Sequence, residues 1–240
     1  MNSTTKSTIE VVLIGLFITA IVTAQLTASK VLAFTLPFSL PITGATLALP
    51  GAALAYALTY FASDCYAELY GMEAAQRLVL VGFGMNFVLL ALVWSTIAAP
   101  ASPAGVDPGT FETVLGASTN IIIGSLVAYV VSQNWDVIVF HKIKAYTHGE
   151  HLWLRNIGST ATSQAIDTVL FVGIGFVVAP AVLGTGGGTP LSIAIQLIVG
   201  QYLLKLAIAV ADTPLVYAVV GLANEFSAPV REYQTGERAD

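Results

Sequence analysis

Long apolar runs are the feature that most constrains this chain of 240 residues. A helix that crosses the hydrocarbon core of a bilayer needs about 20 predominantly apolar residues. We expect a span in each of six segments: residues 11–29, 45–66, 78–98, 118–139, 158–180 and 191–222. Because the runs are continuous rather than alternating, they predict helices. The predicted fold class is all-α, a polytopic membrane protein whose six transmembrane helices form a single transmembrane domain over residues 1–240.

The composition supports this class and excludes others. Charged residues make up only 10% of the chain, whereas soluble domains carry about 25%. The 9 Lys and Arg against 14 Asp and Glu give a net charge of −5, which leaves no basic surface for nucleic acid. We therefore predict the lipid bilayer and a small molecule as partners, and no nucleic acid.

The basic residues between the spans predict the orientation, because Lys and Arg gather on the cytoplasmic side. With the N-terminus inside, only Lys30 faces outward. Seven face the cytoplasm: Lys6, Arg77, Lys142, Lys144, Arg155, Arg231 and Arg238. We predict a multi-pass protein of the cell membrane with both termini, including the polar tail 224–240, in the cytoplasm. The Pro-rich outer segment 34–50 is either a plain connector or a short hairpin.

Charged residues inside the spans mark candidate functional positions, since each costs about 2.5–3.5 kcal/mol at a helix centre. There are five: Asp64, Asp136, Asp167, Lys205 and Asp212. Asp64, Asp136 and Asp212 lie near predicted cytoplasmic ends, where water can reach them. Asp167 and Lys205 lie near the middle of their spans, where we expect a functional site or an ion pair that shapes one.

Polar stripes accompany these charges. Ser159, Ser163 and Asp167 follow one another at four-residue spacing, so they share one helix face, with Gln164 in the adjacent column. Similar stripes occur in other spans: Tyr56, Tyr60, Asp64 and Glu68; Tyr129, Gln133 and Asp136; Gln201, Lys205 and Asp212; and the single amide Asn86. Helices with inward polar faces enclose a polar site or path, which favours a transporter, a channel or an intramembrane enzyme.

Catalytic and metal-binding motifs are weak. The segment His148-Gly149-Glu150-His151 does not have the H-E-x-x-H spacing of a metalloprotease helix. There is no G-x-S-x-G nucleophile motif. We therefore predict no catalytic residue, no metal and no cofactor, and an intramembrane enzyme stays as the less favoured alternative.

Two motifs resemble the queuosine precursor transporter family, which is also called the vitamin uptake transporter family. The first is Asp64-x-x-x-Glu68-x-Tyr70-Gly71 with Ala75 and Arg77, where the Arg comes one place later than in the family. The second is more specific: Trp153-Leu154-Arg155-Asn156, then Ser159-Thr160, Ser163-Gln164, Asp167-Thr168 and Phe171. Weaker matches around Gln133 and Lys205 extend the likeness from about residue 45 to 222.

The resemblance implies a six-span importer of 7-deazaguanine bases for tRNA modification. Its substrate would be 7-cyano-7-deazaguanine or 7-aminomethyl-7-deazaguanine, the precursors of queuosine and archaeosine. The fold would resemble the substrate-binding subunits of energy-coupling-factor transporters. A second function stays open, in which the chain is itself a substrate-binding subunit of a multi-component transporter and needs an ATPase module. The energy source and the oligomeric state, a homo-oligomer included, also stay open.

The chemistry of such a base suggests roles for the polar residues. A deazaguanine presents two adjacent N–H donors that one carboxylate can accept, and its ring can stack on aromatic side chains. Our hypothesis is that Asp167 and Gln164 bind this edge, while Lys205 balances the buried charge in the empty site. In the rival assignment, Asp64 or Glu68 binds the edge and the Asp167–Lys205 pair is structural. The other candidate substrate-binding residues are Ser163, Tyr60, Asn86, Gln133 and Gln201.

Overall fold

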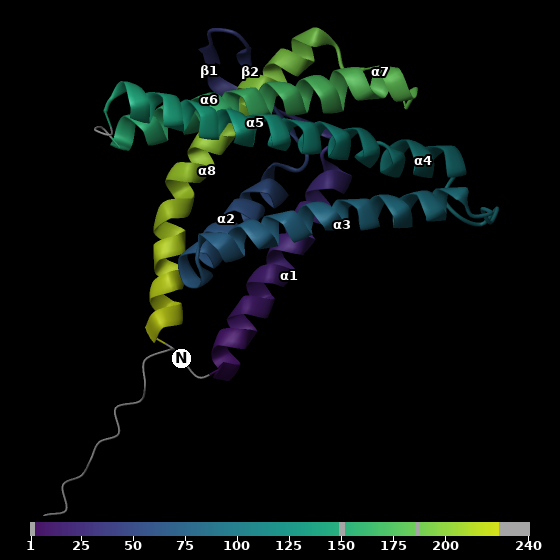
Figure 1. The fold of residues 1–240 in the computed structure, drawn as a ribbon. Helices are drawn as coiled ribbons and strands as arrows, with labels where there is room; N and C mark the ends of the chain where they lie inside the picture. Colours follow the sequence, from purple (N-terminus) through teal and green to yellow (C-terminus); the bar gives the residue numbers. More distant parts are fainter. Residues whose placement is uncertain (1–2, 149–151, 186–187, 226–240) are drawn as a thin grey trace, which may run out of the picture.

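The computed structural model describes residues 3–148, 152–185 and 188–225, and it is mostly helical (Figure 1). Within these ranges, five helical segments are long and apolar enough to cross a membrane: Thr8–Thr27, Met72–Ala98, Pro108–Tyr146, Ile157–Leu183 and Leu191–Ile208. The chain is therefore a polytopic membrane protein. Most of the predicted tail 224–240, with Arg231 and Arg238, lies outside the described residues, as do residues 149–151 of the rejected metal motif.

The first half of the chain departs from the all-α prediction. Helix α1 (Ser3–Thr27) leads into strands β1 (Val31–Leu40) and β2 (Gly44–Pro50), which pair as an antiparallel hairpin before helix α2 (Ala53–Tyr70). The hairpin alternative for residues 34–50 is thus confirmed. The predicted span 45–66 is wrong at its start, because its first residues pair with β1. Helix α2 is not among the five candidate spans, since it carries two carboxylates and four tyrosines in 18 residues.

The other four predicted spans lie within helices. They are α3 (Met72–Ala98), α5 (Ser118–Tyr146), the continuous run of α6 (Leu152–Val172), η1 (Gly173–Val178) and α7 (Ala179–Leu183), and α8 (Leu191–Glu225). The loop before α5 contains a further short helix, α4 (Pro108–Gly116). Asp107 caps α4 by accepting hydrogen bonds from the backbone N–H and hydroxyl of Thr110, at 2.8 and 2.9 Å. These two bonds lower the pKa of Asp107.

The helices pack as two groups. Helices α1, α2 and α3 contact one another, and α5 packs closely against α6, while few direct contacts join the two groups. Helix α8 joins them, since it contacts α2, α6 and strand β2. In Figure 1, α5 and α6 form the upper layer and α1, α2 and α3 lie below them. Side chains fill the space between the two groups, and polar side chains of α1, α2, α5 and α6 face a cavity there.

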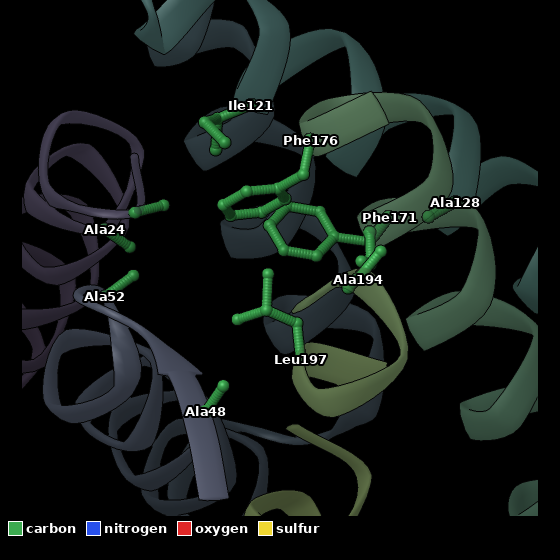
Figure 2. Close-up of a cluster of buried hydrophobic side chains, with 11 residues drawn as sticks. Ala24, Ala48, Ala52, Ile121, Ala128, Phe171, Phe176, Ala194 and Leu197 are labelled. Atoms are coloured by element: carbon green, nitrogen blue, oxygen red, sulfur yellow. The ribbon is translucent and has the colours of Figure 1, made fainter. Parts of the chain in front are cut away.

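The base of the hairpin closes one end of this space, which we call the hairpin end. In a buried cluster there, alanines from α1, β2 and the turns on either side of the hairpin face mostly larger residues from α5, α6, η1 and α8. Figure 2 shows the rings of Phe171 and Phe176 between Ile121 above and Leu197 below. Ala24 and Ala52 face these larger side chains from the left of the view. Close approach requires glycine: a Cβ on Gly200 would lie 2.0 Å from the carbonyl oxygen of Ala48. Strand β2 is therefore pressed against the backbone of α8.

Candidate functional site

A buried ion pair lies between α6 and α8. Lys205 Nζ donates to Asp167 Oδ2 at 2.5 Å, and the exposed fractions of the two side chains are 6% and 15%. Ser132 of α5 donates a second hydrogen bond to Asp167 Oδ1 at 3.3 Å. The structure thus confirms that the two mid-span charges meet. The pair neutralises two charges that would each be costly in the membrane interior.

A cavity of about 220 Å³, which we call the middle cavity, lies beside Asp167. It is bounded by five helices: α1, α2, α3, α5 and α6. Its polar lining includes Gln25, Thr59, Ser63, Ser125, Ser132, Gln133, Gln164 and Asp167. This volume is below the range of about 300–1,000 Å³ that drug-sized ligands occupy, which suits a single small ring system.

Two aromatic pairs form part of the middle cavity's lining. Tyr56 and Tyr60 on α2 meet edge to face, with ring centroids 5.3 Å apart. Phe83 of α3 and Tyr129 of α5 lie 4.4 Å apart at a tilt of 51°. Aromatic faces and edges attract flat π-systems. A carboxylate, three amides and two aromatic pairs around one cavity therefore form a site for a planar ligand rich in hydrogen-bond donors.

A larger cavity of about 450 Å³ lies on the other side of Tyr60 and Gln164, and we call it the open cavity. Its lining comes from α2, α6 and α8, and includes Asp64, Thr160, Tyr202 and Lys205. Tyr60 and Gln164 line both cavities, so these two side chains form the partition between them. Gln164 Oε1 is buried and has no hydrogen-bond partner among the described residues. It is therefore available to a ligand.

A third cavity of about 20 Å³ lies at the hairpin end, and we call it the small cavity. It is lined by Gln25, Tyr56, Ser125, Gln201 and Lys205, together with apolar residues of the helices and of the base of the hairpin. The Lys205 ammonium lies 5.9 Å from the centre of the Tyr56 ring, within the range of a cation–π contact. Lys205 lines the open and small cavities and Asp167 lines the middle one, so the ion pair borders all three.

The structure brings together seven of the ten candidate substrate-binding residues: Asp167, Gln164, Lys205, Asp64, Tyr60, Gln133 and Gln201 each line at least one cavity. The other three lie elsewhere. Ser163 is 5% exposed and donates to Asp136 Oδ1 at 3.1 Å, so it joins α6 to α5. Glu68 is exposed and lines none of these cavities. Asn86 is fully buried on α3, and neither of its side-chain polar atoms has a partner among the described residues.

Several lining residues were not among the predicted candidates. Ser132 contacts Asp167 directly, and Gln25 and Phe83 line the middle cavity. Gln25 carries a detectable signal, because it is the only amide in the first predicted span. Phe83 carries none, since a phenylalanine in an apolar helix is indistinguishable from a packing residue before its neighbours are known.

Comparisons with known proteins bear on this site. The family model described as "Putative vitamin uptake transporter" matches residues 50–219. A protein of Bacillus subtilis (strain 168), named "Probable queuosine precursor transporter", is 30% identical over 164 residues, which cover 68% of each chain. No solved structure matches significantly, so the expected likeness to energy-coupling-factor subunits stays a prediction. The matched residues contain the whole lining of the open cavity, and that of the middle cavity apart from its α1 residues. The match confirms the resemblance in the motifs. This multi-pass membrane protein therefore belongs to the vitamin uptake transporter family, a family of transporters rather than enzymes.

Proposed function

We propose that this chain imports a 7-deazaguanine base, 7-cyano-7-deazaguanine or its 7-aminomethyl relative, for tRNA modification. Family membership supports uptake, and the name of the Bacillus subtilis relative supports a queuosine precursor. One observation carries the choice of a planar, donor-rich substrate. A buried carboxylate, held by a lysine, faces the middle cavity, which two aromatic pairs line.

In the proposed complex, the base lies in the middle cavity with its donor edge toward Asp167. The two adjacent N–H groups donate to the carboxylate, and such charge-assisted bonds are among the stronger ones in proteins. Gln164 Oε1, which has no partner among the described residues, accepts a further donor or orients the edge. The ring lies between the Tyr56–Tyr60 pair and the Phe83–Tyr129 pair.

Lys205 keeps Asp167 paired when no base is bound. Without substrate, the ammonium neutralises Asp167 and prevents an isolated charge in the membrane. When the base binds, its N–H groups replace part of this interaction, and Asp167 keeps the hydrogen bond from Ser132. The site therefore exchanges one set of donors for another without leaving the carboxylate unpaired.

For the direction of transport, we infer that the hairpin end faces outward and that both termini lie in the cytoplasm. The distribution of the basic residues supports this orientation. Asp64 and Ile157 line the open cavity, and both lie near the predicted cytoplasmic ends of their helices. The open cavity then leads to the cytoplasm, the side to which an importer delivers its substrate.

The rival assignment has partial support. Asp64 lines the open cavity beside Tyr60 and Gln164, so it can contact a base there, whereas Glu68 lines no cavity described above. Single Asp64→Asn and Asp167→Asn variants separate the two assignments. We expect Asp167→Asn to weaken base binding more than Asp64→Asn does. The reverse order would assign the edge to Asp64.

The proposed function is tested by rescue of tRNA modification in cells that neither make nor import the precursor. The cells receive this chain and trace 7-cyano-7-deazaguanine, and the modified nucleoside is quantified. We expect modification to return, and to be lost with Asp167→Asn at equal expression. Asp136→Asn is the matched control, because Asp136 is another aspartate within a predicted span but lines none of the three cavities. No rescue by a correctly inserted protein would refute the substrate, and co-purification with ATPase subunits would support the binding-subunit alternative.

A further inference from the structure

Two buried glutamines stand where the substrate path is narrowest. Gln25 of α1 and Gln201 of α8 are each 5% exposed, and both line the small cavity. The Oε1 atom of each has no hydrogen-bond partner among the described residues. Gln25 Nε2 donates to Ser125 of α5 at 3.4 Å, which is a long hydrogen bond. Two unpaired amide oxygens in a buried cavity indicate a polar contact that this conformation of the protein leaves unmade.

The three cavities form a series that narrows toward the hairpin end. The open cavity has about 450 Å³, the middle cavity about 220 Å³ and the small cavity about 20 Å³. The middle and small cavities share Gln25, Tyr56, Ser125 and Phe171 in their linings. A volume of 20 Å³ holds about one water molecule and excludes any nucleobase. This conformation is therefore closed at the hairpin end and open at the other end.

Lys205 connects the narrow point to the substrate site. It lies four residues after Gln201, so the two side chains share one face of α8. Lys205 lines the small cavity, and its ammonium also bonds Asp167, which lines the middle cavity. An ammonium has three donors. A lysine released from Asp167 therefore has two unpaired amide oxygens beside it.

We propose that Gln25 and Gln201 form the outer gate of the substrate path and that Lys205 links this gate to the occupancy of the site. In the empty protein, Lys205 bonds Asp167, and among the described residues the only polar bond that an amide of the gate makes is the long one to Ser125. When a base takes the oxygens of Asp167, Lys205 donates to the gate amides and holds the outer end closed. The base can then leave only through the open cavity. This proposal rests on the proposed function for the identity of the base.

The gate is tested by thiol labelling in sealed membrane vesicles. The native Cys65 is replaced by Ala, and Ala28→Cys serves as the reporter, because Ala28 is 1% exposed and lines the small cavity but not the middle one. A membrane-impermeant thiol reagent is added from the outer side. Without substrate, we expect Gln25→Ala and Gln201→Ala to raise the labelling rate, because each removes a side chain that lines the narrow point. The expected rise is on the order of threefold to tenfold, the equilibrium factor for one hydrogen bond such as the one that Gln25 makes with Ser125. Asn134→Ala is the matched control and should leave the rate unchanged, because Asn134 is an exposed amide of α5 that lines none of the three cavities.

The link is tested by repeating the labelling with saturating 7-cyano-7-deazaguanine. We expect the base to slow labelling of the parent and to have no effect on the Gln201→Ala variant, although both bind it. Equal labelling rates in parent and gate variants without substrate would overturn the gate, whatever the substrate is. Base binding without slower labelling would overturn the role of Lys205, whereas no base binding at all would refute the proposed function instead. A reporter at Ala161 in the open cavity, labelled from the cytoplasmic side, checks that each variant is folded. Where an alanine variant is not folded, Gln25→Asn or Gln201→Asn at the same position replaces it.

Discussion

Removing the lysine of the buried pair is the perturbation with the largest expected effect. Lys205→Met keeps the length and apolar stem of the side chain but leaves Asp167 buried without its cation. The two side chains are only 6% and 15% exposed, so water cannot replace the ammonium fully. Breaking such a pair by removing one partner costs about 3–5 kcal/mol of stability. We expect the lower part of that range, because the hydrogen bond from Ser132 remains.

The measurement is equilibrium unfolding of the purified protein in detergent, by denaturant and by heat. Lys30→Met is the matched control, since Lys30 is exposed and such surface changes usually stay within about 0.5 kcal/mol. The double variant Asp167→Asn/Lys205→Met should recover most of the loss, because neither charge remains buried alone. A loss below about 1 kcal/mol for Lys205→Met, or no recovery in the double variant, would refute the interpretation of the pair as a buried charge compensation.

Three further predictions follow from local geometry. Gly124→Ala should destabilise the protein by about 1–3 kcal/mol, because the new Cβ would lie 2.8 Å from a backbone nitrogen of η1. Gly84→Ala has open space around its Cβ, so in the same unfolding experiment it should stabilise α3 by up to about 1 kcal/mol. The cap of α4 should weaken in acid, because the pKa of Asp107 is lowered in the folded protein. The stabilisation from the ionised cap is present above the unfolded pKa of about 4, and it is lost as the pH falls through the lower folded pKa. Hydrogen exchange of the α4 amides should show this loss, and Asp107→Asn should remove the pH dependence. Gln164→Ala should weaken base binding about tenfold or more, the cost of one hydrogen bond to a buried partner, and a direct binding assay that found unchanged affinity would contradict its place in the site.

Much of the helical architecture follows from the sequence because it depends on local composition. Continuous apolar runs predict α3, α5, α6 and α8 with their approximate positions. The hairpin is different, since its strands are as apolar as a span and their pairing depends on residues about 20 positions apart, such as Val31 and Pro50. An apolar count over residues 45–66 therefore merges a strand with the helix that follows it.

The site shows the same division between local and tertiary information. The cost of a charge in the membrane predicts that Asp167 and Lys205 need partners, and helical spacing predicts that Gln164 lies near Asp167. Helical spacing alone cannot say which stripe faces a cavity. Ser163, on the same stripe as Asp167, is used to bond Asp136, and Ser132 becomes a neighbour of Asp167 only when α5 packs on α6. Contacts between helices decide these roles, and they appear only with the fold.

Uptake of a labelled base by the purified chain is the most direct test of its proposed function. The protein is reconstituted alone into liposomes, and entry of labelled 7-cyano-7-deazaguanine is followed with and without an imposed proton gradient. We expect saturable uptake above that of protein-free liposomes, lost with Asp167→Asn and retained with Asp136→Asn at equal incorporation. Uptake no greater than in protein-free liposomes under both conditions, by a protein that unfolds cooperatively, would contradict the proposed function.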